Sequence, residues 1–386
     1  MRRVYLDYAA TTPVRPEVSE VLLQHFNDVW GNPSSIHACG QEARHAVEEG
    51  RQKVANLIGA KVDEVFFTSG GTESDNMAMQ GVAMAKRAQG NHIITSSIEH
   101  HAIVETGKFL QKQGLSVTFL PVDKYGMVDP DDVKRAITKK TILISIMHAN
   151  NEVGTIQPVA EIGRIAKEAG VYFHTDAVQS TGHIPVNVDD LGVDLLSISA
   201  HKLYGPKGIG VIYIRKGTEI SPIIHGGEQE HEMRAGTENV PGIAGLATAA
   251  ELAGKELKEE SERLTLLRDK LIKGILSILP TAQLNGHPAK RLPNNVNISF
   301  GAVEGESVCL NLDLAGICTS TGSACSSASM EASHVLMAMG LSPELARSSI
   351  RFSMGKWTTE DDIKRVLDTV PAIVNRLRAI SPLTKK

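Results

Sequence analysis

The chain lacks the features that mark disulfide-stapled, membrane-spanning and nucleic-acid-binding proteins. Its 386 residues include only four cysteines and no CxxC pair, so neither a disulfide framework nor a zinc ribbon is supported. No run of about 18 apolar residues occurs, and the first residues carry no apolar signal segment. The formal net charge of -4 gives no basic excess that would favour nucleic acid or an anionic membrane. We therefore expect a cytoplasmic, unanchored protein that acts on a small molecule.

Short apolar runs alternate with helix-period segments between residues 64 and 215, as in strand–helix–strand units. This alternation predicts an α/β fold whose mainly parallel, doubly wound sheet has helices on both faces. Helical patterns are found at Glu73 to Lys86, Ala102 to Gln113 and Val159 to Ala169. The expected strands read EVFFTS, HIITSS, SVTFLPV, TILISIMHA, VYFHTD, LLSISA and GVIYIR.

The pattern changes towards the C-terminus, where a long charged amphipathic helix is expected from Leu246 to Leu279. Beyond it, NNVNISF and SIRFSM read as strands, Glu306 to Leu314 as a helix, and a terminal helix begins at Thr358 or Thr359. These segments predict a smaller α+β domain. We place the large domain at residues 12–258, and the small domain at residues 1–11 together with 259–386.

Lys202 stands at the end of the apolar run LLSISA, directly before a Gly/Pro-rich turn. A second strand pattern ends at Asp176, with His174 on the same face. A lysine amine that forms a Schiff base, and a carboxylate that keeps a pyridine nitrogen protonated, are what pyridoxal 5′-phosphate requires. Lys207, inside the turn, is an alternative anchor. A Schiff-base lysine must lose its proton, however, which favours the desolvated strand end.

A phosphate site is expected where the strand EVFFT is followed by Gly70, Gly71 and Thr72 at the start of a helix. The free N–H groups of such a helix start bind anions. Ser199 and His201, beside Lys202, would reach the same phosphate in a parallel sheet. The alternative is an ordinary glycine turn in which Thr72 is only the N-cap.

Two further candidates are a histidine pair and a cysteine. His100 and His101 end a strand and start a helix, where a ring could lie on the cofactor and move protons, or serve only as a polar cap. Cys325 lies in TSTGSACSSAS, among small residues, so we expect an exposed thiol on a loop that is mobile from Ser320 to about Ser329. It is either a nucleophile or a fortuitous surface cysteine. No metal site is predicted, because the spacing of the histidines in HGGEQEHEM matches no zinc motif.

Together these residues resemble the cysteine desulfurases, the NifS/IscS-like enzymes of the fold-type I pyridoxal-phosphate superfamily. The resemblance runs over essentially the whole chain. Its motifs are LDYAATTP, GNPSSIH, TSGGTES, EHHAI, NNEVGTIQP, HTDAVQS, SAHKLYGPKG, RAGTEN, GSACSSAS and RSSIRFS.

The resemblance implies roles for individual residues. Lys202 would bind the cofactor covalently, Asp176 would pair with its ring nitrogen, Gln179 with its ring hydroxyl, and His100 would stack on the ring. The phosphate would be held by Gly71, Thr72, Ser199 and His201, and Thr237 would reach the phosphate of a partner subunit. Asn151 and Arg351 would bind the substrate carboxylate, and Cys325 would be the nucleophile. Shared active sites imply a homodimer.

The implied activity is a sulfurtransferase reaction that converts L-cysteine to L-alanine and leaves a persulfide on Cys325. The acceptor would be an iron–sulfur cluster scaffold protein, and Cys325 could serve as a transient cluster ligand. A selenocysteine lyase or another β-lyase on the same fold remains an alternative. An aminotransferase has no use for a mobile cysteine, and a non-catalytic relative should have lost Lys202 or Cys325.

Overall fold

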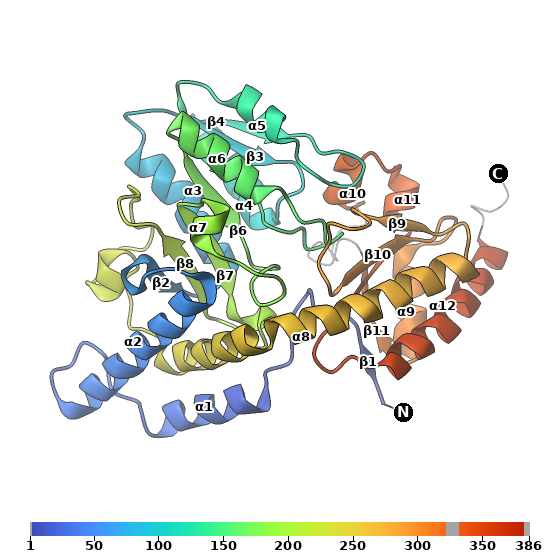
Figure 1. Cartoon of the computed structure of the whole chain (residues 1–386), viewed down its shortest axis with the longest axis horizontal. Coiled ribbons are helices and arrows are strands. Elements are labelled where there is room, and N and C mark those ends of the chain that lie inside the picture. Colours follow the sequence, from blue (N-terminus) through green and yellow to red (C-terminus); the bar gives the residue numbers. More distant parts are fainter. Residues whose placement is uncertain (1, 322–331, 382–386) are drawn as a thin grey trace.

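The computed structural model describes residues 2–321 and 332–381. A large sheet and a small sheet lie side by side, and the long helix α8 (Val240–Ile278) runs from beneath the first to the second (Figure 1). Within the part of the chain that is described, no helix combines the length and the apolar character needed to cross a membrane.

The large sheet contains the strands that the apolar runs predict, and most of its strand pairs are parallel. β8 is the exception, because it runs antiparallel to both of its neighbours, β2 and β7. The strand order is β2-β8-β7-β6-β5-β3-β4. The strands are β2 (Val65–Thr68), β3 (His92–Ser96), β4 (Ser116–Leu120), β5 (Thr141–Ser145), β6 (Tyr172–Asp176), β7 (Leu195–Ser199) and β8 (Gly210–Ile214).

Helices cover both faces of this sheet, as predicted, because neighbouring strand residues point to opposite sides. Phe67 and Ile94 pack into one core with α2, α6 and the first half of α8, whereas Phe66 and Ile93 pack into another with α3 and α4. The helices of this region are α1 (Pro16–Asn27), α2 (Ala38–Ile58), α3 (Gly71–Ala85), α4 (His101–Lys112), α5 (Pro130–Ala136), α6 (Val159–Ala169) and α7 (Val188–Leu191), with 3-10 turns η1 (Val62–Glu64), η2 (Ala200–Lys202) and η3 (Gln229–Glu232).

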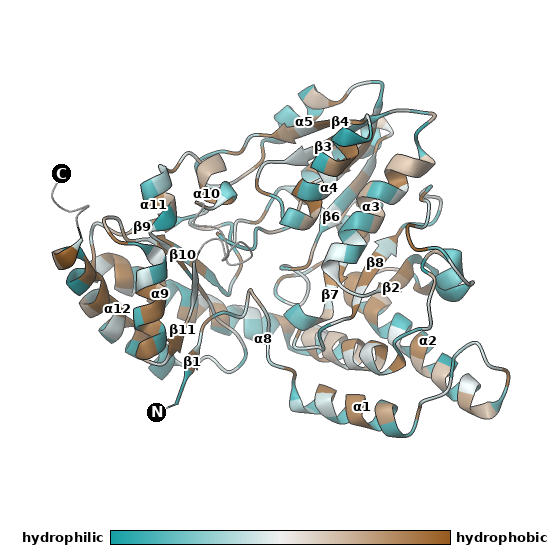
Figure 2. Cartoon of the chain, turned by 180° about the vertical axis from the view of Figure 1, so that it is seen from behind, coloured by the Kyte–Doolittle hydropathy of each residue, from teal (hydrophilic) through white to brown (hydrophobic). Residues whose placement is uncertain are grey.

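The smaller unit is an antiparallel sheet, in the order β12-β13-β10-β9, packed against helices. The N-terminal strand β1 pairs with β11, so both ends of the described chain contribute to its core. In Figure 2, α12 carries both brown and teal segments, which fits a helix with one buried face. The elements are β1 (Val4–Tyr5), β9 (Gln283–Asn285), β10 (Asn295–Ser299), β11 (Ile317–Cys318), β12 (Ser320–Thr321), β13 (Ser349–Ser353), α9 (Gly305–Leu314), α10 (His334–Ala338), α11 (Pro343–Arg347) and α12 (Glu360–Ile380).

Helix α8 begins earlier than predicted, at Val240 instead of Leu246. Asn239 caps it by accepting a hydrogen bond from the backbone N–H of Gly242, and Pro241 occupies the first turn. The helix contributes to the cores of both units without a break, so the division between residues 258 and 259 stays a prediction. The terminal helix begins where expected, with Thr359 as its N-cap.

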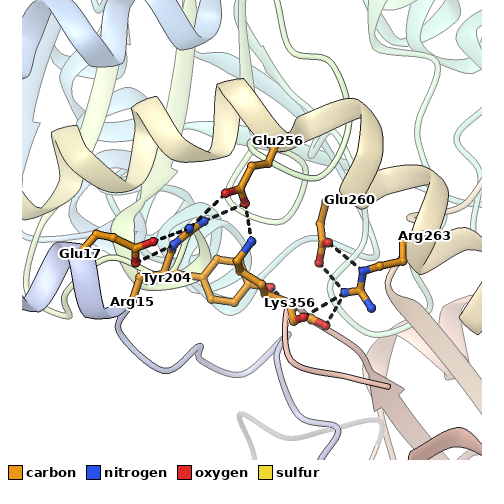
Figure 3. A network of polar contacts seen from close by, with 8 residues as sticks. Arg15, Glu17, Tyr204, Glu256, Glu260, Arg263 and Lys356 are labelled. Carbon is orange, nitrogen blue, oxygen red and sulfur yellow. Dashed lines mark hydrogen bonds and ion pairs between the residues drawn. The ribbon is translucent and has the colours of Figure 1, made fainter. Parts of the chain in front are cut away.

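A polar network joins the two units beside α8 (Figure 3). Glu256, on α8, accepts hydrogen bonds from the guanidinium of Arg15 at 2.8 Å and from Nζ of Lys356 at 2.6 Å. The backbone N–H of Lys356 also donates to the hydroxyl of Tyr204, at 2.8 Å. Arg15 precedes α1, whereas Lys356 follows β13, so one carboxylate connects segments of both units.

The packing of α8 gives a test with a matched control. Leu271→Ala should lower the free energy of unfolding by about 2–5 kcal/mol, because Leu271 is fully buried in the small core and its removal leaves a cavity. Leu266→Ala on the same helix removes a side chain that is 72% exposed and should change it by about 0.5 kcal/mol or less. Urea unfolding measures both, and equal losses would contradict the assignment of the buried face.

Candidate functional site

A cavity of about 360 Å³ lies at the carboxyl ends of β6 and β7, between the two units. The C-terminal edge of the strands is where open α/β sheets bind ligands. The small unit closes the cavity with Arg351, from β13. Its lining is Ala9, Ala10, Gly71, Thr72, Asp75, His100, Met147, Asn151, Asp176, Val178, Gln179, Ser199, His201, Lys202 and Arg351.

Lys202 ends the short turn η2 after β7, and its amine reaches into this cavity. The amine Nζ donates to the carbonyl oxygens of Ala9 at 2.5 Å and Ala10 at 2.7 Å. Lys207 lies in the exposed turn that follows and does not line the cavity. Of the two lysines, the geometry therefore favours Lys202 as the anchor.

Asp176 ends β6 and is buried at the bottom of the cavity. Its Oδ1 accepts a hydrogen bond from the backbone N–H of Val178 at 2.9 Å. Burial raises the pKa of Asp176 to about 6, and the Val178 bond and the positive charge of Lys202 oppose the rise. The carboxyl is therefore ionised at neutral pH and can pair with a protonated ring nitrogen.

A second buried carboxyl, Asp75, lines the same cavity, and the sequence reasoning missed it. Burial raises its pKa well above the ordinary value, and the charge of Asp176 raises it further. The available signal was its position on the inner face of α3, next to the apolar residues Met77 and Ala78, where an unpaired carboxylate is unusual. The cavity thus holds two carboxyl groups instead of the single one predicted.

The start of α3 forms a cup for an anion. Gly70 occupies the cap position with φ +154°, so Thr72 is not the N-cap that the alternative interpretation required. A Cβ on Gly71 would lie 2.8 Å from Cγ2 of Val178, and a Cβ on Gly210 would lie 2.6 Å from Cα of Gly70. Glycine is therefore needed for this close approach.

Hydroxyl and imidazole groups surround this helix start. Thr72, Ser199 and His201 line the same cavity, as the sequence predicted for a phosphate site. Nδ1 of His201 lies 3.1 Å from Oγ1 of Thr11, and burial together with nearby Lys202 lowers the pKa of His201 to about 4. A neutral imidazole can still donate one hydrogen bond.

His100 combines the two roles that the sequence left open. It is the N-cap of α4, since its Nδ1 accepts a hydrogen bond from the backbone N–H of Ala102 at 3.1 Å, and it also lines the cavity. Burial, followed by the charges of Lys202 and His101, lowers the pKa of His100 to about 4. The ring is therefore neutral at physiological pH. His101 stacks on His334 instead, with ring centroids 4.7 Å apart.

Arg351 brings a buried guanidinium to the cavity. Its Nη2 lies 2.9 Å from Oδ1 of Asp7, and its Nη1 donates to the carbonyl oxygen of Asn151 at 3.0 Å. Within the described residues its Nε has no hydrogen-bond partner. A buried, incompletely satisfied guanidinium beside a cavity is suited to a carboxylate ligand. Asn151 also lines the cavity, as predicted.

The remaining predicted residues divide into three cases. Gln179 lines the cavity, and its Nε2 donates to the carbonyl oxygen of Ala9 at 3.0 Å. Thr237 is exposed and lines a different pocket, of about 250 Å³, with Phe26 and Trp30, so one chain does not bring it to the site. Cys325 lies outside the described residues, as does most of its predicted mobile loop, of which Ser320 and Thr321 form β12.

The residues present fit pyridoxal 5′-phosphate. A lysine amine, an ionised carboxylate, a glycine-lined helix start and a neutral imidazole line one cavity, each of the type that a different part of this cofactor requires. The guanidinium-bearing residue Arg351, which lines the same cavity, adds a partner suited to a substrate carboxylate. The arrangement can therefore hold the cofactor and an amino acid together.

The pKa of His100 provides a test of this electrostatic environment. Lys202→Ala should raise the pKa of His100, by about 1 unit at most, because the substitution removes a positive charge while leaving the ring buried. NMR titration of the histidine rings of the cofactor-free protein measures this, with His100→Gln identifying the resonance. Lys207→Ala should leave the pKa unchanged. The same pKa in all three proteins with His100 would show that burial alone sets it.

Comparison with known proteins gives a consistent family. Residues 4–366 match the model of the family described as Aminotransferase class-V. A protein named cysteine desulfurase IscS from Dictyoglomus turgidum is 60% identical over 381 residues, which covers 99% of this chain and 97% of that protein.

Solved structures agree with this result. A NifS-like protein matches with a TM-score of 0.92 and 41% identity, covering 97% of this chain and all of the other. A structure described as SspA in complex with cysteine matches with a TM-score of 0.82 and 36% identity, covering 92% of this chain and 100% of the other. The chain therefore belongs to the aminotransferase class-V family and, within it, to the NifS/IscS-like cysteine desulfurases, which are pyridoxal-phosphate enzymes of fold type I.

Proposed function

We propose that the cavity between the two units binds pyridoxal 5′-phosphate and L-cysteine, and that the protein converts L-cysteine to L-alanine while its sulfur passes to Cys325. The observation that carries this proposal is the convergence of Lys202, Asp176 and Arg351 on one cavity. When bound, the cofactor supplies an electron sink for the charge that develops as the α-proton of the amino acid leaves.

Three residues position the ring. Lys202 would bond covalently to the cofactor, Asp176 would accept a hydrogen bond from the protonated ring nitrogen, and Gln179 would donate one to the ring hydroxyl. The pKa of Asp176, about 6, supports its role because the carboxyl is then negative at neutral pH. His100 would cover the ring. Burial keeps its pKa near 4, so the imidazole is neutral and has a ring nitrogen that can accept a proton from the substrate.

The phosphate is held at the start of α3. Backbone N–H groups at Gly71 and Thr72, the hydroxyl of Ser199 and the ring of His201 are the donors, and their common position around the cavity supports this role. The helix dipole adds favourable partial charge at the same place.

The substrate carboxylate pairs with Arg351 and with the amide of Asn151. The position of Arg351 in the cavity lining supports this pairing, and Asp7 keeps the guanidinium in place before substrate arrives. A relative 36% identical to this chain is described in complex with cysteine, which supports an amino acid of this size as the ligand.

The thiolate of Cys325 attacks the sulfur of the bound cysteine. An S–S bond forms as the C–S bond breaks, the electron pair of that bond stays on the carbon, and protonation of the carbon leads to alanine. The sulfur leaves Cys325 when a second thiol, that of an iron–sulfur scaffold protein, attacks the persulfide. A cytoplasmic location stays a prediction.

The active protein is a homodimer with shared sites. Thr237 supports this, since it is exposed on its own chain and would bind phosphate only if a second copy brought it there. The side chains of Phe26 and Trp30 are 65% and 70% exposed and line the same pocket as Thr237. A second copy that approaches Thr237 would cover this apolar surface, which favours association.

Sulfide and alanine production from L-cysteine, with reductant and added cofactor, tests the reaction. The wild type should yield both products in equal amounts, and Cys325→Ala should yield neither, because no thiol then accepts the sulfur. Cys318→Ala, which removes another thiol of the small unit, should retain activity.

Equal output from the wild type and Cys325→Ala would mean that sulfide is eliminated directly and that the role of Cys325 is wrong. The same assay with L-selenocysteine distinguishes a selenocysteine lyase, which would act on that substrate and leave L-cysteine unchanged.

Sedimentation equilibrium tests the dimer. Trp30→Ser should raise the dissociation constant of the dimer about 30-fold, since buried tryptophans at interfaces often contribute about 2 kcal/mol or more. Leu314→Ser removes an apolar side chain that is 86% exposed on the small unit, and should leave the constant unchanged. A monomeric wild type would contradict the proposal outright, and unaltered association of Trp30→Ser would remove this surface from the interface.

A further inference from the structure

Asp75 is a cavity residue that the reaction described above does not use. It lies in the second turn of α3, its side chain is 1% exposed, and it lines the cavity together with Asp176. Its Oδ1 has no hydrogen-bond partner among the described residues. An unsatisfied carboxyl oxygen at such depth is costly unless a ligand or a proton compensates for it.

No cation compensates for Asp75 within the described part of the chain. The nearest basic group is the imidazole of His174, whose Nε2 lies 3.7 Å from Oδ1 of Asp75. Burial lowers the pKa of His174 to about 3, so this contact is not an ion pair. The ring is also engaged by Ser197 at Nε2 and by Ser145 at Nδ1, at 3.0 and 2.8 Å.

The other titratable groups around Asp75 are mostly acidic. Asp176 comes from β6, and Glu99 comes from the segment between β3 and α4. The negative charge of each raises the pKa of Asp75, whereas a hydrogen bond from Ser197 lowers it. Lys202 acts on Asp176, where its charge opposes protonation. Because the negative charge of Asp176 raises the pKa of Asp75, the two buried carboxyls favour a state in which Asp75 keeps its proton.

Binding of the cofactor changes this balance, because its protonated ring nitrogen brings a positive charge to Asp176. We propose that Asp75 is the second counter-charge of the ring nitrogen: it is neutral in the cofactor-free protein and loses its proton when the cofactor binds. The protonated ring then faces two carboxylates. This inference rests on the cofactor assignment in the proposed function, and Asp75, which acts through Asp176, is a positioning residue.

Asp75 loses one proton in this step. The O–H bond of Asp75 breaks, and its electron pair stays on the carboxylate oxygen. If the ring nitrogen arrives without a proton, the proton that Asp75 loses balances the one that forms the N–H bond. If the ring arrives protonated, the proton of Asp75 goes to the buffer. In both cases Asp75 gives up one proton. The amide side chain of Asp75→Asn has no such proton to lose.

Calorimetric titration with pyridoxamine 5′-phosphate tests this, since that compound carries the same ring but forms no bond with Lys202. Performed in two buffers of different ionisation enthalpy, slightly above neutral pH, it counts the protons exchanged on binding. The wild type should take up one proton fewer, or release one more, than Asp75→Asn. In the same complexes, NMR of the isotope-labelled ring nitrogen should show deprotonation about 1 to 3 pH units lower in Asp75→Asn.

Glu152→Gln is the matched control, because Glu152 is also a buried carboxyl whose pKa is raised by burial, to about 7, yet it neither lines the cavity nor contributes to the pKa of Asp75. Its proton balance on binding should equal that of the wild type. Asp75→Ser, which is smaller and also neutral, replaces Asp75→Asn if the amide prevents folding.

Equal proton balances for the wild type and the Asp75 variants would overturn the inference, as would a wild-type complex whose ring nitrogen is unprotonated. If pyridoxamine 5′-phosphate binds to none of the proteins, the cofactor assignment fails. If it binds to all of them with equal proton balance, only the role of Asp75 fails.

Discussion

The site depends on one extended segment, residues 7–12, which crosses from the small unit to the large one. β1 ends just before it and is paired with β11, so the segment is fixed at its start. Its backbone carbonyls and side chains then contact the groups around the cavity. Asp7 binds Arg351, the carbonyl of Ala9 accepts from Lys202 and Gln179, that of Ala10 accepts from Lys202, and Thr11 contacts His201. Without this segment, the amine of Lys202 would lose two carbonyl acceptors and the guanidinium of Arg351 would lose its carboxylate partner.

Much of the site could be predicted from sequence because its residues follow strands. Asp176, Ser199 and Lys202 come after apolar runs, and the ends of parallel strands meet at one edge of a sheet. The direction of β8 could not be predicted, since an antiparallel strand buried on both faces has the same apolar pattern as a parallel one. The amphipathic pattern that predicts α8 does not mark its start, which lies at Val240 after the cap residue Asn239.

Asp75 and Asp7 show where such prediction stops. Asp75 belongs to the site because α3 turns one face towards β6. Asp7 belongs to it because the two units together enclose the cavity. Neither contact follows from local periodicity, which reports whether a residue faces a core and not which residue it meets there. Thr237 is a related case, because the family resemblance predicts a role for it although on its own chain it lines a different pocket from Lys202.

Burial sets the protonation states throughout this region. The imidazoles of His100, His174 and His201 are held neutral, while the carboxyls nearby have raised pKa values. The charge that remains is concentrated on a few groups, among them Asp176, Lys202 and Arg351. These few charges are fixed in place before a charged ring or substrate enters. Preorganised charges of this kind interact strongly with the groups that they bind.

Helix α8 has a mechanical consequence. Its 39 residues run through both cores without a break. Bending it requires disturbing backbone hydrogen bonds along a rod of about 58 Å, calculated at 1.5 Å per residue. The carboxylate of Glu256, on this helix, accepts hydrogen bonds from Arg15 in one unit and Lys356 in the other, and so links the two units. The continuous helix and the bonds of Glu256 therefore oppose hinge motion between the two units, and so oppose changes in the separation of Lys202 and Arg351.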